Sequence, residues 1–368
     1  MPLRVVIAPD SFKGSLNAPD VALAIADGWR SVRADDDLVL LPQADGGEGT
    51  LAAVASAVPG AVLRSAGDVT GPDGRPVGGM WLELPDGTAV VELAQASGLP
   101  RMAALDPLGA TTRGLGEVIG AALDAGATAL VIGLGGSAST DGGAGALSAL
   151  GLGLLDDDGR PVRDGGGELA RVTVVERSGM RDAPAGGVRL LSDVTAPLLG
   201  PEGAAAVFGP QKGAGEEDIR TLDTALASFA MLLGDGAATP GAGAAGGAGY
   251  GFLAAWGARI EAGSQAIATL TGLDRQAASA DVVITGEGRF DATSVTGKVV
   301  GNALALIDTG DGRPMVIAGR LGAEPVTPDG RAVWARALSD LAGSADAAMA
   351  DPQRWLRVAG AEAAAAVS

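Results

Sequence analysis

The chain contains 368 residues, 47% of them hydrophobic, so it can bury more than one large core and is expected to form two or three domains. Its 26 lysine and arginine residues against 44 aspartate and glutamate residues give a net charge of −18, which repels nucleic acids and anionic membranes. Cysteine and histidine are absent, which excludes disulfides, thiolate catalysis, cysteine zinc sites and Ser-His-Asp triads. Proton transfer would therefore use a carboxylate, a lysine or water.

The first predicted element is a buried parallel strand over residues 4–8. A helix follows, with Asn17 as its N-cap and Pro19 in its first turn. The loop between them lies at the carboxyl edge of the strand, where open α/β sheets bind ligands, and it carries Asp10, Ser11, Lys13 and Ser15. No apolar leader precedes the strand and no run of about 18 strongly apolar residues occurs, so we expect a cytoplasmic protein without a membrane segment.

A second strand is predicted over residues 37–41 and a helix over residues 50–57. Asp45 and Glu48 lie at the junction between them, in the glycine-rich sequence QADGGEGT. The glycines would let a ligand approach the backbone closely. For Glu48 we favour the simpler interpretation of an acid placed at a helix N-terminus.

From about residue 62 the pattern changes to alternating apolar and polar residues, which predicts antiparallel hairpins. PDG turns at Pro72–Gly74 and Pro85–Gly87 separate the strands. Because units typical of parallel sheets lie at both chain ends, we expect a middle domain inserted into a discontinuous first domain.

A strand over residues 129–133 leads into the loop GLGGSAST and then into a helix predicted over residues 141–155. Gly133, Gly135 and Ala138 match the G-x-G-x-x-A fingerprint of a dinucleotide-binding turn, and the acidic residues 156–158 follow at about the expected spacing of 20 residues. The loop fits equally well as a phosphate cradle of backbone N–H groups. The sequence DDDGRPV is typical of a hairpin turn, which weakens the dinucleotide interpretation.

The stretch from Leu190 to Gly215 joins a strand end to a helix and then to a loop. Asp193 follows the strand, Pro201 is expected to open the helix, and Lys212 is expected in a flexible glycine-flanked loop. A carboxylate and a lysine in these places suit phosphoryl transfer. An ordinary βα turn with a solvated lysine explains the same residues.

The remaining chain is mostly helical. A strand over residues 281–285 is expected to run into a loop that carries Glu287, Asp291 and Lys298. Further predicted elements are a strand over residues 314–318 and helices over residues 216–233, 298–307, 340–350 and 353–366.

Only three of the 26 basic residues are lysines, namely Lys13, Lys212 and Lys298, and each is next to a glycine. A compact ammonium on a flexible stem is not interchangeable with a guanidinium at a phosphate, so we hypothesise a functional role for at least two of them. Glycine-rich loops with lysines would hold phosphates, and carboxylates would hold Mg²⁺. Phosphoryl transfer needs mainly positioning and charge neutralisation, so the missing histidine does not exclude it.

Six motifs, in order along the chain, resemble those of the bacterial glycerate kinase family that is neither P-loop nor ribokinase-like. They are APDSFKGSL, PQADGGEGT, GLGGSASTDGGAG, SDVTAPLLGPEGAAAVFGPQKGA, GAGAAGGAGYG and VVITGEGRFD. The resemblance implies Mg²⁺-dependent phosphorylation of D-glycerate by ATP. The branch that these motifs match best is credited with making 2-phosphoglycerate, and other members with making 3-phosphoglycerate.

The resemblance also implies an α/β fold with two domains. A doubly wound, flavodoxin-like parallel sheet is expected in residues 1–65 and 275–368, with a mixed-sheet α/β domain inserted as residues 66–274 and the active site in the cleft between them. D-glycerate and ATP are the expected ligands, without nucleic acid or membrane partners, and a homodimer is left open.

Site residues are carried over as hypotheses. Catalytic roles are assigned to Asp193, Lys13, Lys212 and Asp45. Contacts to substrate or phosphate are assigned to Asp10, Ser11, Ser15, Gly135, Gly136, Ser137, Lys298 and Arg289. The candidate metal ligands are Asp193, Glu287 and Asp291.

The chain departs from the family pattern in places. Ser192 replaces a common cysteine, Phe290 replaces a usual isoleucine, and residues 298–304 read KVVGNAL where relatives carry a proline-containing pattern. Two rival functions are a nicotinamide-dependent oxidoreductase that uses the GLGGSA loop and a non-catalytic nucleotide-binding regulator.

Overall fold

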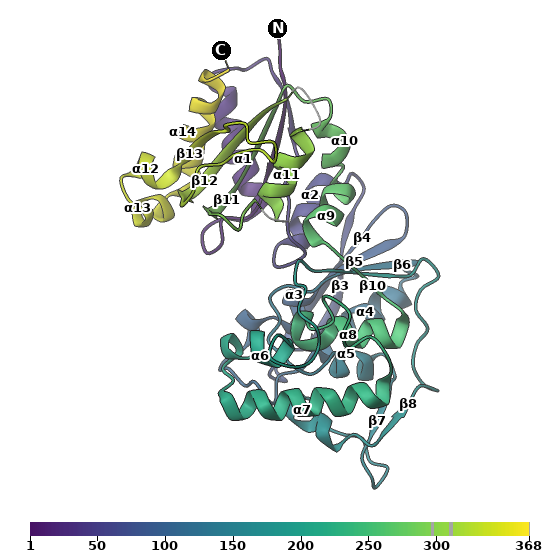
Figure 1. The fold of residues 1–368 in the computed structure, drawn as a ribbon. Coiled ribbons are helices and arrows are strands. Elements are labelled where there is room, and N and C mark those ends of the chain that lie inside the picture. Colours follow the sequence, from purple (N-terminus) through teal and green to yellow (C-terminus); the bar gives the residue numbers. More distant parts are fainter. Residues whose placement is uncertain (296–297, 309–311, 368) are drawn as a thin grey trace. The chain divides into compact units, whose positions relative to one another are not determined.

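The computed structural model describes residues 1–295, 298–308 and 312–367, and it divides into two compact units (Figure 1). Unit 1 comprises Met1–Asp45, Ala52–Pro59 and Ala262–Ser368, and unit 2 comprises Gly46–Leu51 and Gly60–Glu261. The return to unit 1 comes earlier than residue 275, because helices α9 (Gly263–Thr271) and α10 (Leu273–Ala277) contribute buried side chains to a core of unit 1.

Unit 1 is built on a sheet of five parallel strands in the order β13-β12-β11-β1-β2. The strands are β1 (Arg4–Pro9), β2 (Asp37–Leu40), β11 (Val282–Phe290), β12 (Arg313–Leu321) and β13 (Trp334–Ala337). From β1 the chain continues to β2 on one side, whereas from β11 it continues to β12 on the other. This is the flavodoxin-like order, and its topological switch point lies between β1 and β11.

Helices cover both faces of this sheet (Figure 1). On one face the strands pack against α1 (Ala18–Arg30) and α14 (Pro352–Ala365), and on the other against α10 and α11 (Val299–Asp308). Asn17 caps α1 as predicted, because its Oδ1 atom accepts a hydrogen bond of 2.9 Å from the backbone N–H of Asp20. Two short helices precede α14, namely α12 (Leu338–Ala342) and α13 (Ala345–Ala350).

Unit 2 contains a mixed sheet in the order β10-β9-β6-β5-β4-β3. Strands β5, β6, β9 and β10 are parallel, and β3, β4 and β5 form the antiparallel hairpins that the PDG turns predict. The strands are β3 (Val62–Thr70), β4 (Pro76–Glu83), β5 (Thr88–Glu92), β6 (Ala129–Gly133), β9 (Val188–Leu191) and β10 (Arg259–Glu261), and β7 (Gly153–Leu155) pairs with β8 (Val174–Glu176).

The helices of unit 2 share one large hydrophobic core with its sheet. They are α3 (Leu93–Ser97), α4 (Arg113–Asp124), α5 (Ala144–Ala149), α6 (Ala204–Phe208), α7 (Glu216–Leu233) and α8 (Ala244–Trp256), with 3₁₀ turns at Leu99–Arg101, Gly166–Arg171 and Pro210–Lys212. Helix α2 (Thr50–Ala57) spans the chain boundary between the units. The fold class predicted from the sequence, two α/β domains with one inserted into the other, is confirmed.

Several predicted elements have the wrong length. The helix predicted over residues 141–155 ends at Ala149, because Gly151 adopts φ +98° and residues 153–155 pair as β7. The helix predicted over residues 340–350 is interrupted at Gly343, which adopts φ +84°. Helix α6 begins at Ala204, after Pro201. Strand β11 continues to Phe290, so Glu287 lies on a strand and not in a loop.

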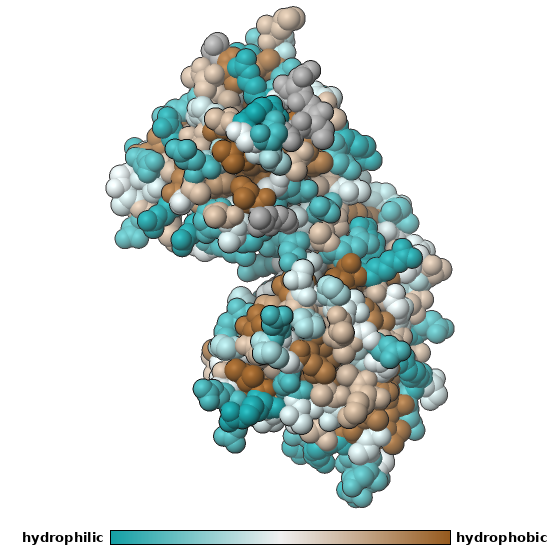
Figure 2. All heavy atoms as spheres, in the orientation of Figure 1, coloured by the Kyte–Doolittle hydropathy of each residue, from teal (hydrophilic) through white to brown (hydrophobic). Residues whose placement is uncertain are grey.

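Hydrophilic residues cover most of the face drawn in Figure 2, and apolar residues on it are scattered or in small groups. Over the ranges that the structure describes, no helix combines the length and the apolar character needed to cross a lipid bilayer.

Candidate active site

A cavity of about 380 Å³ lies in unit 1 at the carboxyl ends of β1, β11 and β12. This position includes the switch point between β1 and β11, where open α/β sheets bind ligands. The cavity brings together eight residues that the sequence assigns to a site: Asp10, Ser11, Lys13, Ser15, Asp45, Glu287, Arg289 and Lys298.

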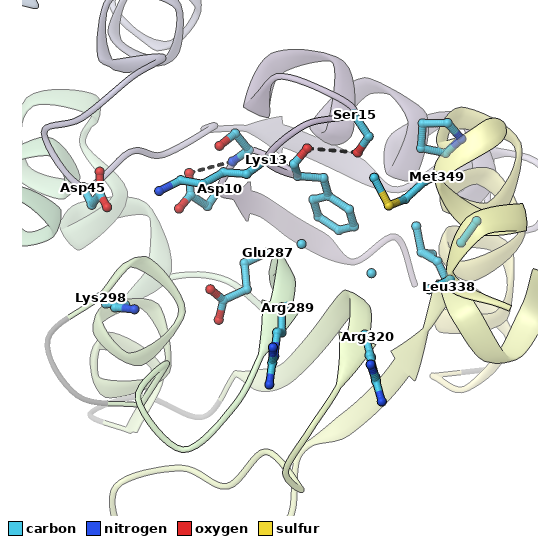
Figure 3. A pocket seen from close by; sticks show the side chains of 17 residues that line it. Asp10, Lys13, Ser15, Asp45, Glu287, Arg289, Lys298, Arg320, Leu338 and Met349 are labelled. Atoms are coloured by element: carbon cyan, nitrogen blue, oxygen red, sulfur yellow. Dashed lines mark hydrogen bonds between the residues drawn. The ribbon is translucent and has the colours of Figure 1, made fainter. Parts of the chain in front are cut away.

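Carboxylates gather at one part of this cavity (Figure 3). Burial, and then the neighbouring Asp45 carboxylate, raise the pKa of Asp10 to about 7, although its Oδ1 atom accepts a 2.6 Å hydrogen bond from the backbone N–H of Ser11. Burial also raises the pKa of Glu287. Among the residues that the structure describes, none makes a hydrogen bond to the buried Oε1 atom of Glu287. These carboxylates would be stabilised by a cation.

Mg²⁺ usually takes one or two carboxylates together with phosphate oxygens and water. Within the described part of the chain, no three acidic, histidine or cysteine side chains are close enough to hold a metal ion by themselves. The carboxylates of Asp10 and Glu287 both line the cavity and would supply the one or two ligands that a phosphate-bound Mg²⁺ needs. The buried Oε1 atom of Glu287 has lone pairs that could bind the cation. The residues therefore fit a metal that arrives with a phosphate ligand.

Cationic side chains line the same cavity. Arg289 on β11 and Arg320 on β12 are register partners on neighbouring strands, and their side chains extend in the same direction (Figure 3). The Nε atom of Arg289 lies 3.6 Å from the Oδ2 atom of Asp291. Asp291 is not among the residues that line the cavity, and hydrogen bonds from the Thr293 hydroxyl and backbone N–H lower its pKa. The structure gives Asp291 a place in a turn beside the cavity.

A second cavity, of about 540 Å³, lies in unit 2 at the carboxyl ends of β6 and β9. It brings together four residues that the sequence assigns to a site: Gly135, Gly136, Ser137 and Lys212. Its walls also contain Ser192, Gln211 and Ala245. Ala245 adopts φ +53° and is the one non-glycine residue with positive φ in the described ranges. Such strained positions occur preferentially at functional sites.

The position of Lys212 differs from the predicted one. It lies in a 3₁₀ turn and is 2% exposed, not in a flexible loop. Its Nζ atom donates hydrogen bonds to the Oγ atom of Ser137 at 2.9 Å and to the backbone oxygen of Ser139 at 2.5 Å. Burial lowers the pKa of Lys212 to about 7, although the buried Asp141 carboxylate opposes this shift. Lys212 therefore holds the glycine-rich loop in place from inside unit 2.

The glycine-rich loop is also fixed by close backbone approaches. A Cβ atom on Gly133 would lie 2.5 Å from the backbone oxygen of Gly46, and one on Gly135 would lie 2.4 Å from the Cα atom of Gly47. Packing against another loop thus explains these glycines without a dinucleotide. Asp156, at the spacing of a ribose ligand, accepts hydrogen bonds from the backbone N–H groups of its own turn. These contacts weaken the dinucleotide interpretation. They also occupy part of the loop, because the backbone N–H groups of Gly135 and Ala138 donate to the backbone oxygens of Gly46 and Ser97.

Asp193 is exposed and is not among the residues that line the second cavity, although both of its neighbours, Ser192 and Val194, do line it. Its assigned roles in catalysis and metal binding stay predictions.

Sequence reasoning missed several residues of the first cavity. Arg320 lies beyond residue 318, where strand β12 is predicted to end because the apolar run stops there, and the strand in fact continues to Leu321. Met349 and Leu338 come from helices near the C-terminus that carry no motif. Only the folding of the chain brings them to the cavity.

Comparison with known proteins identifies the family. The family model described as "Glycerate kinase family" matches residues 5–368. The chain is 44% identical to the glycerate 2-kinase of Escherichia coli K12 over 309 residues, which cover 81% of this chain and 80% of that protein. It is 45% identical to the glycerate kinase of Bacillus subtilis 168 over 307 residues, covering 80% and 79% of the two chains.

A solved structure described as glycerate kinase 2, from Salmonella typhimurium LT2, is also similar. It superposes with a TM-score of 0.86 at 38% identity and covers 100% of this chain and 98% of its own. A family match over nearly the whole chain, together with relatives above 40% identity, leaves one assignment. The chain belongs to the glycerate kinase family and is a kinase.

Proposed function

We propose that this enzyme transfers the γ-phosphoryl group of ATP to D-glycerate in the presence of Mg²⁺ and releases 2-phosphoglycerate and ADP. One observation carries the proposal: carboxylates and cations share one cavity at the switch point of a parallel sheet in unit 1. Phosphoryl transfer needs this combination, because it depends on positioning and charge neutralisation more than on covalent chemistry. The 2-position is supported by the 44% identity to a protein named glycerate 2-kinase.

In this proposal Asp10 and Glu287 would hold Mg²⁺, which would neutralise negative charge on the transferred group. Lys13 stabilises the phosphoryl oxygens, since a flexible ammonium can follow a moving charge. A hydroxyl oxygen of D-glycerate attacks the γ-phosphorus as the bond to the ADP oxygen breaks. Asp45 and Asp193 are the candidates that orient this hydroxyl or accept its proton.

The cavity of unit 2 suits the recognition of a small hydroxy acid. The backbone N–H of Gly136 and the hydroxyl of Ser137 provide hydrogen-bond donors, and Lys212 supplies positive charge behind them. The backbone N–H of Gly135 instead donates to the backbone oxygen of Gly46. An anion bound there would also favour the protonated form of Lys212.

The decisive experiment combines an ADP-release assay with ³¹P NMR of the product. Wild-type protein, ATP, Mg²⁺ and D-glycerate should give ADP and the phosphorus signal of 2-phosphoglycerate. A signal of 3-phosphoglycerate would support the alternative regiochemistry. Absence of glycerate-dependent ADP release would contradict the proposal, and omission of Mg²⁺ by chelation is the matched control.

Cytoplasmic location and a homodimer belong to the same proposal as expectations about the protein's setting. Cell fractionation and sedimentation velocity test them directly.

A further inference from the structure

The cavity of unit 1 changes character along its length. Asp45 and Lys298 lie on one side in Figure 3, whereas Leu338 and Met349 lie on the opposite side. The second side is apolar and is made from Phe12, Leu338, Ala345, Ala348, Met349 and Pro352. A ligand that fills the whole cavity must therefore have one charged end and one apolar end.

One large residue of the apolar side is exposed to solvent. Met349 is 57% exposed although it lies beside the buried Leu338 and Ala348. Methionine is polarisable and adaptable, and it makes favourable contacts with aromatic rings. A flat heteroaromatic ring would remove this side chain from water. D-glycerate has three carbons and no apolar surface of this kind.

The space between the two ends is bordered by backbone. Gly288 and Gly319 line it, and a Cβ atom on Gly319 would lie 2.4 Å from the backbone oxygen of Gly288. The close approach of β11 and β12 therefore requires glycine. No side chain of these two residues separates the apolar side from Lys13 and Glu287, so one extended ligand can reach both.

Arg289 and Arg320 flank this middle part as register partners on adjacent strands. Like charges placed directly opposite each other destabilise a sheet. A polyanion between the two ends would compensate for this cost, because guanidinium groups bind phosphate oxygens through charge-assisted hydrogen bonds.

We propose that the cavity of unit 1 is the nucleotide site, with the base against Met349 and Leu338 and the phosphates extending past Arg320 and Arg289 toward Lys13 and Glu287. This assignment rests on the proposed function for the identity of the nucleotide as ATP. It gives Arg289, Arg320 and Met349 roles in nucleotide binding and leaves the hydroxy acid to other residues.

Two pairs of variants test the assignment. Arg289→Ala removes a guanidinium whose side chain is 72% exposed and lies 3.6 Å from a carboxylate. Its control is Arg220→Ala on α7, whose guanidinium is 71% exposed and lies 3.9 Å from a carboxylate. Met349→Asp places a charge at the apolar side, and Met231→Asp on α7, at a residue 82% exposed, is its match. Neither control residue lines a cavity described above.

The readouts are the Kd of MgADP by calorimetry and the KM values for ATP and for D-glycerate. Arg289→Ala should raise the Kd of MgADP and the KM for ATP about tenfold or more, because it removes a charge-assisted hydrogen bond. Met349→Asp should raise them by a similar factor, because it replaces an apolar contact to the base with a charge. The KM for D-glycerate and both control variants should stay within about twofold of wild type, as surface changes away from a site do.

The outcomes separate this inference from the proposed function. A rise in the KM for D-glycerate with an unchanged Kd for MgADP would overturn the nucleotide assignment and leave glycerate phosphorylation intact. Wild-type protein that binds no MgADP would also overturn it. Wild-type protein that binds MgADP but does not phosphorylate D-glycerate, with binding lost in both variants, would support the nucleotide site and contradict the proposed function.

Discussion

The Nζ atom of Lys212 lies 2.9 Å from the Oγ atom of Ser137, so the one lysine of unit 2 is joined to the loop that lines the cavity there. A second hydrogen bond, of 2.5 Å, ends on the backbone oxygen of Ser139. Lysine is among the residues that are almost never fully buried unless they are paired. These contacts make Lys212 a positioning residue for the loop as well as a source of positive charge.

Replacement of Lys212 should therefore impair catalysis strongly. Lys212→Met is expected to lower kcat/KM for D-glycerate by roughly 10²-fold or more, because it removes charge stabilisation and releases the loop. Ser137→Ala removes a single acceptor and should cost about tenfold or less. Steady-state kinetics at saturating ATP measure both. A Lys212→Met enzyme within about threefold of wild type would refute the role.

Lys212 should also make stability depend on pH. Its pKa is about 7 in the folded chain against 10.5 in the unfolded chain, so between these values the unfolded state binds more protons and stability falls as the pH is lowered. Lys212→Met removes this pH dependence, because methionine has no proton to lose. Its stability relative to wild type should rise by up to about 1.4 kcal/mol per pH unit on going from pH 9.5 to pH 7.5. Urea unfolding across that range measures the difference, and a constant difference would show that Lys212 keeps an ordinary pKa.

Asp10 should make stability depend on pH in the opposite direction, with stability falling as the pH rises. Its pKa is about 7 in the folded chain against 3.8 in the unfolded chain, so the folded state keeps a proton that the unfolded state has released, and stability is lost as the pH rises toward 7. Asp10→Asn should therefore gain stability over wild type by up to about 2 kcal/mol between pH 5.5 and pH 7.5, while it loses activity.

Asp291→Asn provides the control for that experiment. The pKa of Asp291 is lowered, not raised, so its carboxylate is ionised in both states over this range. The difference between Asp291→Asn and wild type should not change between pH 5.5 and pH 7.5. An equal pH dependence in both variants would contradict the shift at Asp10.

Two helical glycines differ in the space around them. A Cβ atom on Gly360 of α14 would lie 2.3 Å from the backbone oxygen of Ile25 on α1, whereas one on Gly120 of α4 would meet nothing within 4 Å. Gly360→Ala should destabilise unit 1 by about 1–3 kcal/mol through overpacking. Gly120→Ala should stabilise unit 2 by about 0.5–1 kcal/mol, since alanine is the better helix former. Hydrogen exchange of peptides from α1 and α4 measures each unit separately, and equal effects would contradict the packing of α1 on α14.

Elements with strong local signals were predicted well. The cap at Asn17, the PDG turns of unit 2 and the helix over residues 216–233 all depend on residues within a few positions of one another. Elements that depend on distant neighbours were predicted poorly. Strand β11 extends to Phe290 because its last residues pair with β12, and β13 was missed because its partners lie on that same strand.

The residues of the candidate site show the same contrast between local and distant signals. The sequence by itself determined which loops carry carboxylates, lysines and glycines, because these loops follow strand ends that local patterns reveal. Only the tertiary structure decided that Lys212 is buried against the loop of Ser137, and that Met349 shares a cavity with Asp10. Burial and pKa depend on what packs around a side chain, and those neighbours come from segments far apart in the chain.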